Sequence, residues 1–362
     1  MTLPSFDREQ NMAQILELFQ PGKTAALVAH LNPDGDAIGS VLALSLLLEA
    51  RGMHVTKLLA RIDEVPKLFT FLKNYGFELD YVRAADYTGT PDLLIALDLS
   101  VASRMDKAQP VLDRAGATIM IDHHQNPEDF ADYVLHDATA AATGMLVWDL
   151  IKASGEQITP AMATACMLAL ITDTGRFSFS SNSPEVFSAA AEMVAAGADP
   201  VGISQALYDT RTMGSFKLDA RLVERMEYLI DGIAVYSWVT ENDFAELGVA
   251  LDDTEGLIAI LRAVQGAEVS ALLREDSLND GTGRKQVRIN LRARSDYDVS
   301  KLAADHGGGG HQAAAGFNFS GTIPEAARAI QHYLVSEGKL AEMAAAQSTE
   351  DYGETGGATW VG

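Results

Sequence analysis

The sequence predicts an α/β protein of two domains: a mostly parallel sheet with helices on both faces, then a smaller mixed α/β domain. Three observations support this. The chain has 362 residues, more than one domain usually holds. Strand-like and helix-like segments alternate through its first half, which is typical of a parallel sheet covered on both faces. After about Ala190, a long helical segment leads into a second group of strands.

In the first domain, strands are expected where short apolar runs lie between turn residues. These runs are Thr24–His30, Val55–Ala60, Leu93–Asp98 and Thr118–Asp122. After the first run, leucine and alanine recur with a helical period over Gly39–Arg51. Gly52 follows at a position where glycine commonly ends a helix. The segment therefore predicts a strand–helix–strand unit.

The second domain begins with a predicted helix over roughly Gly214–Leu229. Its strands are expected at Ile233–Thr240, Ala267–Arg274 and Gln286–Arg292. The predicted boundaries place the first domain at residues 1–195, a linker at 196–216 and the second domain at 217–340. Residues 341–362 are polar, acidic and rich in glycine, a composition that predicts a disordered tail.

The charge of the chain is unusually negative. Lys+Arg 27 against Asp+Glu 50 gives a net charge of −23. A protein that grips long duplexes normally carries a basic stripe, and none is visible, although divalent cations can supply positive charge locally. A single cysteine, Cys166, is typical of a reducing compartment. No signal peptide is recognised, and the longest apolar run, around 38–48, is too short to span a bilayer. We therefore expect a cytoplasmic protein with no membrane contact.

Metal-binding side chains gather where the predicted strands and one apolar helix end. In open parallel sheets, function collects at the carboxyl ends of the strands. Four segments place such side chains there: His30 with Asp34 and Asp36, then Asp98, then Asp122 with His123 and His124, and finally Asp173. Singly, several of these have an ordinary structural explanation, such as a solvated turn or a polar strand end. Together they predict one shared site.

The residue types at this site indicate the kind of metal. Aspartate and histidine suit Mn²⁺, with Mg²⁺ and Co²⁺ as alternatives, and the absence of cysteine ligands argues against structural zinc. Several carboxylates around one point would repel each other strongly without a cation. A bridging carboxylate can hold two ions about 3.5–4 Å apart, an arrangement that suits phosphoryl transfer. The sequence thus predicts a two-metal centre.

The same residues, in this order, resemble motifs one to four of the DHH phosphoesterase family. Near the C-terminus, Gly307–His311, followed by Gln312–Phe317, resembles the glycine-rich signature of the DHH-associated domain. The resemblance covers about residues 10–335. It implies a catalytic domain and a substrate-binding domain that face each other across a cleft, and it suggests a homodimer.

The resemblance also implies a role for each ligand. One metal ion would be held by His30, Asp34 and Asp98. The other would be held by Asp36, Asp98, His123 and Asp173, so that Asp98 bridges the two ions. Two residues would be catalytic: Asp122, which orients a histidine, and His124, which lies beside the scissile phosphate.

Substrate binding is implied for a second set of residues. These are Arg292, Gly308, Gly309, Gly310 and His311 in the second domain, and Arg104 in the first. Glycine lets backbone N–H groups approach a phosphate or base closely. The family often has Arg-Ser where this chain has Arg292-Ala293, so one phosphate contact made by a hydroxyl is missing here.

Among family members, the chain resembles the bacterial nanoRNases, the bifunctional oligoribonuclease/pAp phosphatases. The resemblance implies that it hydrolyses short RNA or DNA oligonucleotides, including dinucleotides such as linear pApA, to nucleoside 5′-monophosphates. 3′-Phosphoadenosine 5′-phosphate (pAp) and cyclic dinucleotides are further candidate substrates. The alternatives are a RecJ-like single-strand exonuclease and, in another class, an inactive nucleotide-binding sensor. A sensor is expected to have lost a ligand such as Asp36 or Asp173, and both are present.

Overall fold

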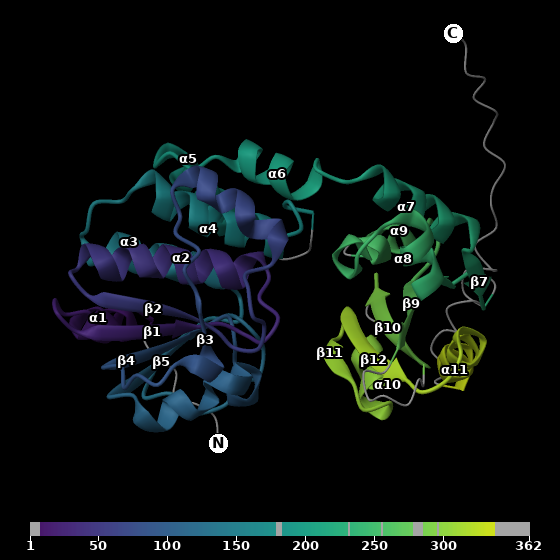
Figure 1. Ribbon diagram of the computed structural model, residues 1–362, viewed down its shortest axis with the longest axis horizontal. Helices are drawn as coiled ribbons and strands as arrows, with labels where there is room; N and C mark the ends of the chain where they lie inside the picture. Colours follow the sequence, from purple (N-terminus) through teal and green to yellow (C-terminus); the bar gives the residue numbers. More distant parts are fainter. Residues whose placement is uncertain are drawn as a thin grey trace, which may run out of the picture. The chain divides into compact units, whose positions relative to one another are not determined.

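The computed structural model describes residues 8–178, 183–230, 232–254, 256–277, 285–294 and 297–336. They form two compact units that divide between Thr210 and Arg211, and each unit is described by itself (Figure 1). The division falls within the predicted linker, residues 196–216, which also contains the helix α6 (Pro200–Tyr208). The predicted tail, residues 341–362, lies outside the described residues.

The first unit is built on a parallel sheet of six strands in the order β3-β2-β1-β4-β5-β6. The strands are β1 (Thr24–Val28), β2 (His54–Leu59), β3 (Val82–Arg83), β4 (Leu93–Leu97), β5 (Ala117–Asp122) and β6 (Tyr133–His136). The strand order reverses at β1, which pairs with β2 on one side and β4 on the other. The carboxyl ends of strands at such a switch point form the usual binding crevice of an open α/β sheet.

Alternate residues of these strands enter two different cores, as the two-residue repeat of a strand requires. On one face, side chains such as Leu27 and Ile95 pack against the helices α2 (Gly35–Ala50), α3 (Thr143–Ser154) and α4 (Pro160–Asp173). Figure 1 shows α2 and α4 above the strands. A Cβ atom on Gly39 would lie 2.4 Å from the carbonyl oxygen of Ala165, so glycine at this position permits the close contact between α2 and α4.

The other face of the sheet is covered differently from expectation. There, Val28 and Ala96 pack against the 3₁₀ segments η2 (Ala84–Asp86) and η3 (Ala102–Arg114) rather than against α-helices. Within η3, Pro110 lacks a backbone N–H and Asp106 has a positive φ of 43°, and both features interrupt a regular helix. The predicted α/β class with helical segments on both faces is confirmed.

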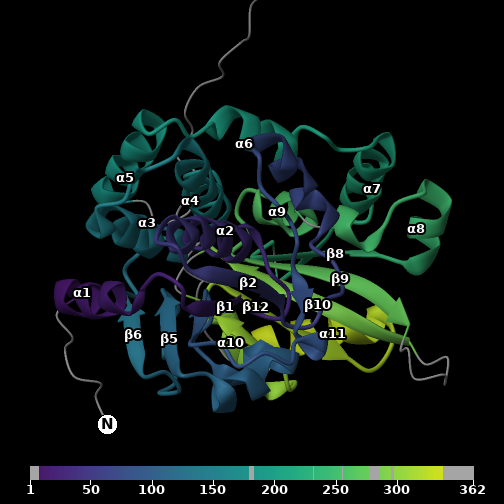
Figure 2. The same ribbon diagram turned by 60° about the vertical axis from the view of Figure 1, so that its left-hand side comes forward.

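Four further elements complete the first unit. They are α1 (Arg8–Leu18), η1 (Lys67–Tyr75), α5 (Pro184–Ala195) and α6. Figure 2 shows α1 beside the edge strand β6, where the Asn11 side chain donates to the Val134 carbonyl at 2.9 Å. No single described helix has the length and apolar composition to cross a membrane, although α5 and α6, taken together across their 105° bend, meet that test by length and composition alone.

The second unit contains a mixed sheet in the order β11-β12-β10-β9-β8-β7. The strands are β7 (Glu227–Leu229), β8 (Ala234–Val239), β9 (Val269–Ser277), β10 (Lys285–Ala293), β11 (Gly309–His311) and β12 (Ala314–Phe319). Only β8 and β9 pair in parallel among the described strands of this sheet. This mixed sheet confirms the predicted class of the second domain.

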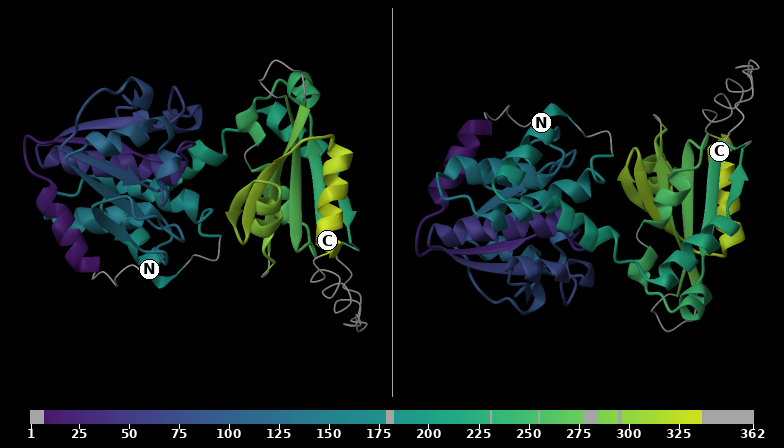
Figure 3. Two further views of the ribbon diagram at one scale, coloured as in Figure 1. Left: turned by 90° about the horizontal axis from the view of Figure 1, so that it is seen from below. Right: turned by 90° about the horizontal axis from the view of Figure 1, so that it is seen from above.

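Helices cover both faces of this sheet. They are α7 (Met213–Glu224), α8 (Glu241–Leu247), α9 (Leu257–Arg262), α10 (Val299–Asp305) and α11 (Ile323–Ser336), with the short 3₁₀ segment η4 (Leu251–Thr254). Ile330 and Leu334 of α11 are buried in the core on one face, and Figure 3 shows α11 lying along the strands. Leu218 and Leu222 of α7 enter the core on the other.

The predicted helix over Gly214–Leu229 is too long. The helix α7 ends at Glu224, and the next residues form β7, in which Glu227 and Leu229 pair with Tyr236 and Ala234 of β8. Pairing with β8, the next strand along the chain, therefore overrides the local helical pattern of these residues.

Candidate active site

Asp98 lies at the centre of the candidate site, directly after β4 at the switch point. Its side chain is 3% exposed, and its φ of 57° is in the left-handed region that only glycine, asparagine and aspartate adopt readily. One carboxylate oxygen, Oδ2, lies 3.4 Å from His30 Nε2, whereas Oδ1 lies 3.7 Å from His123 Nε2. Asp98 therefore presents its two oxygens to two different groups of ligand-type side chains.

The first group consists of His30, Asp34 and Asp98, whose ligand atoms all lie within 4.8 Å of one another. His30 follows β1, and its Nε2 is 3.8 Å from Asp34 Oδ2. The other oxygen of Asp34, Oδ1, accepts hydrogen bonds from the backbone of Asp36 and Ala37, both at 3.1 Å. Asp34 thus caps the N-terminus of α2 with one oxygen and faces His30 with the other.

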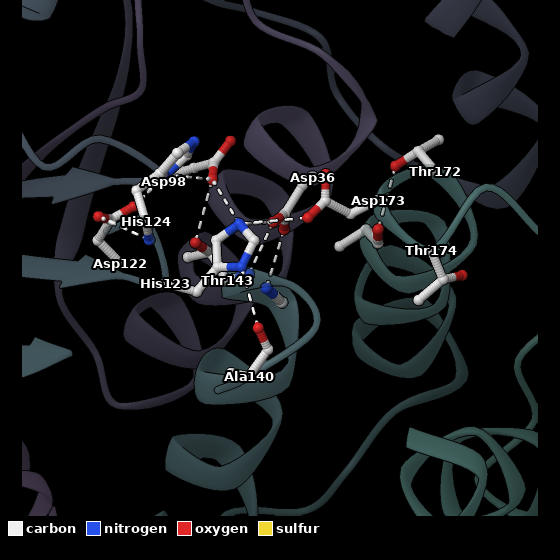
Figure 4. A network of polar contacts seen from close by, with 12 residues as sticks. Asp36, Asp98, Asp122, His123, His124, Ala140, Thr143, Thr172, Asp173 and Thr174 are labelled. Atoms are coloured by element: carbon white, nitrogen blue, oxygen red, sulfur yellow. Dashed lines mark hydrogen bonds and ion pairs between the residues drawn. The ribbon is translucent and has the colours of Figure 1, made fainter. Parts of the chain in front are cut away.

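The second group consists of Asp36, His123 and Asp173. His123 Nε2 lies 3.7 Å from Asp36 and 3.2 Å from Asp173. Figure 4 shows the His123 ring next to the carboxylates of Asp36 and Asp98, with Asp173 beside Asp36. His123 Nδ1 is 3.1 Å from the Ala140 carbonyl oxygen, which can only accept. Nδ1 therefore carries a proton, which leaves Nε2, the nitrogen that faces the carboxylates, as the atom that could bind a metal.

Asp36 is held in place by groups that the sequence analysis did not identify. The backbone N–H groups of Thr143 and Gly144, at the start of α3, donate to its two oxygens at 2.7 and 2.9 Å. Ser40 Oγ donates to it at 2.9 Å, and the Thr143 hydroxyl donates to Asp98 at 3.2 Å. The N-terminus of a helix favours negative charge. The Thr-Gly pair at a helix start was the only signal in the sequence, and it is a weak one.

Asp122 and His124 form a pair beside Asp98. The Asp122 side chain is fully buried at the end of β5, and its Oδ1 lies 2.7 Å from His124 Nδ1. The other oxygen accepts from the His124 backbone N–H at 3.1 Å. His124 Nδ1 is also 3.7 Å from Asp98. The ring of His124 is therefore held at the edge of the candidate site by a buried carboxylate.

The electrostatics of the site call for a cation. Burial, together with the charges of Asp36, Asp34 and Asp173, raises the pKa of Asp98 well above its usual range. Burial and the charge of Asp36 raise the pKa of Asp173 to about 8. Without a cation, bound protons neutralise part of the negative charge of the buried carboxylates. The imidazole nitrogens and carboxylate oxygens fit a pair of divalent ions such as Mn²⁺.

We expect the metal-free protein to lose stability as the pH rises from about 4, the ordinary pKa of an aspartate, to about 8, the pKa of Asp173. A carboxyl whose pKa is raised on folding binds its proton more tightly in the folded state than in the unfolded state. Its contribution to the free energy of unfolding therefore falls by up to about 1.4 kcal/mol for each unit by which the pH rises. Urea unfolding in EDTA at pH 5 and pH 8 measures this loss.

Mn²⁺ displaces those protons, so it should stabilise the protein more at pH 8 than at pH 5. Asp173→Asn removes one of the titrating groups, so the stability of the metal-free variant should depend less on pH than that of the wild type. An equal stability of the metal-free wild type at both pH values would contradict this account of the site.

The predicted substrate-binding residues lie in both units. Arg104 is half-buried in η3 of the first unit, and among the described residues its side chain makes no hydrogen bond or ion pair. In the second unit, Arg292 lies opposite Ala314 of β12, which in turn lies opposite His311 of β11. Arg292 Nη1 donates to the Leu291 carbonyl at 2.9 Å. Arg292 and the glycine-rich strand thus share one end of the second sheet.

Two of the predicted glycines, Gly308 just before β11 and Gly310 within it, pack tightly against β12. A Cβ atom on Gly308 would lie 2.3 Å from the carbonyl oxygen of Gly316, and Gly310 has a φ of 144°. By contrast, a Cβ atom on Gly309 would meet no atom within 4 Å. Close backbone packing against β12 therefore explains glycine at two of the three positions.

Each unit matches the profile of a known protein family. The profile described as the DHH family, N-terminal domain, matches residues 24–170, and that of the DHHA1 domain matches residues 232–336. The first range includes every candidate metal ligand except Asp173. The second includes Arg292 and the segment Gly308–His311.

Individual relatives match over most of the chain. A bifunctional oligoribonuclease and PAP phosphatase NrnA of Thermus thermophilus is 30% identical over 295 residues, which are 82% of this chain and 84% of that protein. A cyclic-di-AMP phosphodiesterase PdeA of Listeria monocytogenes is 25% identical over 333 residues, 87% of this chain and 48% of that protein. A solved structure of an exopolyphosphatase-related protein of Bacteroides fragilis superposes with a TM-score of 0.83 at 26% identity, over 91% of this chain and 96% of that one.

Proposed function

We propose that this chain, which belongs to the DHH family of metal-dependent phosphoesterases, is a Mn²⁺-dependent enzyme that hydrolyses short oligonucleotides to nucleoside 5′-monophosphates. The observation that carries the proposal is the position of Asp98. Its two oxygens face two separate groups of ligand-type side chains, as a carboxylate shared by two ions must. Sites with two metal ions are typical of phosphoryl-transfer enzymes.

The described ligands divide between the two ions as follows. One ion would be held by His30, Asp34 and Asp98, and the other by Asp36, Asp98, His123 and Asp173. When bound, two divalent ions would supply positive charge to the phosphoryl oxygens and to an attacking water. The backbone N–H donors at the start of α3 fix the orientation of the Asp36 carboxylate.

His124 is the residue we assign to the leaving group. Asp122 holds the His124 ring through Nδ1 at 2.7 Å and so fixes the orientation of the imidazole. A protonated His124 beside Asp98 would donate a hydrogen bond to the scissile phosphate or a proton to the departing oxygen. Asp122 would act through His124 as a positioning residue.

Substrate recognition is assigned to residues of both units. Arg292 would pair with a terminal phosphate, because a guanidinium presents parallel N–H donors to phosphate oxygens. The strand Gly308–His311 would place backbone N–H groups against the nucleotide, and Arg104 would add positive charge in the first unit. A preference for short substrates would suit an acidic protein of net charge −23, since its surface repels long polyanions.

Two further substrates are favoured by specific relatives. The Thermus thermophilus protein is named as a PAP phosphatase, and the Listeria monocytogenes protein as a cyclic-di-AMP phosphodiesterase. pAp and a cyclic dinucleotide are therefore the second and third candidates for this chain. All three candidate substrates present a phosphate ester to the same metal centre, so the second unit would decide among them.

The test is product analysis with Mn²⁺ on a panel of substrates. The panel contains an RNA dinucleotide, a DNA dinucleotide, linear pApA, pAp, cyclic di-AMP, a 24-residue RNA and pyrophosphate. We expect dinucleotides to give monophosphates much faster than the 24-residue RNA is shortened. Replacing Mn²⁺ by Mg²⁺ or Co²⁺ at equal concentration identifies the preferred ion.

Other outcomes would select other functions. Rapid degradation of the 24-residue RNA would favour a RecJ-like exonuclease, and turnover of pyrophosphate alone would refute the oligonucleotide assignment. Binding of nucleotides without turnover of any substrate would indicate an inactive sensor.

A further inference from the structure

One ring nitrogen of His30 has no partner in the described structure. Its Nε2 faces Asp34 and Asp98, as a metal ligand would. Its Nδ1 is buried and makes no hydrogen bond. A histidine that binds metal through one nitrogen almost always donates a hydrogen bond from the other. His123 follows this rule through Ala140, whereas His30 does not.

A second residue with an unpartnered polar atom, Tyr81, lines the same small cavity as His30. The hydroxyl oxygen of Tyr81 is buried without a hydrogen-bond partner. Both Tyr81 and His30 line a cavity whose other walls are mostly aliphatic, including Ile38, Val41 and Leu58. Leaving a buried polar group unsatisfied costs about 1–3 kcal/mol. Two such groups at one cavity therefore indicate a shared partner.

The size of the cavity matches one water molecule. Its volume is about 10 Å³, and on this measure a single water needs about 10–15 Å³ together with two to four polar partners. A larger ligand does not fit. An apolar cavity of this size would be expected to stay dry, but two of the residues that line this one carry a buried polar atom without a partner.

We propose that this cavity is a site for one buried water, which bridges the Tyr81 hydroxyl and His30 Nδ1 and makes Tyr81 a positioning residue for the metal ligand His30. The water accepts the Nδ1–H of His30, which leaves the Nε2 lone pair directed at the metal site. It also accepts the hydroxyl proton of Tyr81. Burial raises the pKa of that hydroxyl far above its usual range, so Tyr81 remains a donor.

The inference rests on the proposed metal site but not on the proposed substrate. Metal binding without substrate is therefore the right measurement. Tyr81→Phe removes one hydroxyl and keeps the ring, and Tyr87→Phe is the matched control in the same unit, since Tyr87 does not line this cavity. Outer partners of metal-binding histidines contribute about 10- to 100-fold in affinity.

Calorimetric titration with Mn²⁺, supported by electron paramagnetic resonance of free Mn²⁺, should show about tenfold weaker binding at one of two sites in Tyr81→Phe. The control should bind as the wild type does. Thermal unfolding in EDTA checks that both variants are folded. If the wild type binds no Mn²⁺, the metal proposal itself fails. If Tyr81→Phe binds both ions as tightly as the wild type, the role of Tyr81 is refuted while the metal proposal stands.

A second readout concerns the proton on His30. In ¹⁵N-histidine-labelled protein, we expect the His30 ring to be in the Nδ1–H form, with a proton protected from exchange by the buried water. The signal is assigned by its loss in His30→Gln. In Tyr81→Phe the protection should fall, which a purely structural role of the ring would not cause. A high-resolution crystal structure with no water within hydrogen-bond distance of both atoms would overturn the proposal.

Discussion

An Asp98→Asn variant should fold normally and lose about a thousandfold or more in kcat on a dinucleotide, which corresponds to about 4 kcal/mol of barrier. Asparagine has the shape of aspartate and adopts the same left-handed backbone as Asp98, whose φ is 57°. What it lacks is the second negatively charged oxygen. Since the oxygens of Asp98 face both ligand groups, the variant should bind Mn²⁺ weakly at both. Steady-state kinetics and Mn²⁺ titration measure the two losses.

The same variant should be more stable than the wild type when both are free of metal. The Asp98 carboxylate is buried among other acids, and burial raises its pKa well above the usual range. Asparagine is neutral without binding a proton, so the variant avoids the free-energy cost of either protonating this acid or burying its charge. Asp106→Asn is the matched control, because Asp106 also has a positive φ but pairs with Arg61 away from the site. A metal-free Asp98→Asn protein less stable than the wild type would argue against a metal centre at this position.

An Arg292→Ala variant should lose about 10- to 100-fold in kcat/KM, mainly through a higher KM. A hydrogen bond to a charged group contributes about 1.5–3 kcal/mol, and each 1.4 kcal/mol is tenfold in affinity. The affinity for Mn²⁺ should not change, because Arg292 belongs to the second unit and the candidate ligands to the first. Initial rates over a range of dinucleotide concentration, with and without a terminal phosphate, measure the effect.

Arg328→Ala on the exposed side of α11 is the control for the loss of one positive charge. It should leave KM unchanged. If Arg292→Ala raised KM equally for substrates with and without the terminal phosphate, Arg292 would not be the residue that binds this phosphate. A fall in kcat with an unchanged KM would place its effect at the chemical step instead.

The strands that position the candidate site were predictable because they are continuous apolar runs. A buried parallel strand such as β4 is apolar on both faces, and this pattern can be read without knowing its neighbours. Three of the strands that were not predicted are too short to show a continuous apolar run. β3 has two residues and β6 four, while β11 consists of Gly309–His311. These strands exist because a neighbouring strand supplies their hydrogen bonds, and that pairing is not visible in local sequence.

The candidate ligands were predictable for a related reason. Parallel strands bring their carboxyl ends to one edge, so acidic and histidine side chains at several strand ends must meet. The residues that hold those ligands were not predictable. Thr143 and Gly144 act on Asp36 through backbone N–H groups from more than 100 positions away. Every residue except proline has such a group, so residue type cannot reveal it.

Gly39 and Gly144, where the helices of the first unit touch, affect the positions of two candidate ligands. Asp36 lies on α2 and Asp173 ends α4, and Gly39 permits the contact between these helices. A Cβ atom on Gly144 would similarly lie 2.3 Å from the Ala169 Cβ. Because these glycines have no side chain, the helices pack closely, and this packing sets the distance between the two carboxylates. A methyl group added at either glycine would push the helices apart and change the distance between the Asp36 and Asp173 carboxylates, although neither glycine is itself a candidate ligand.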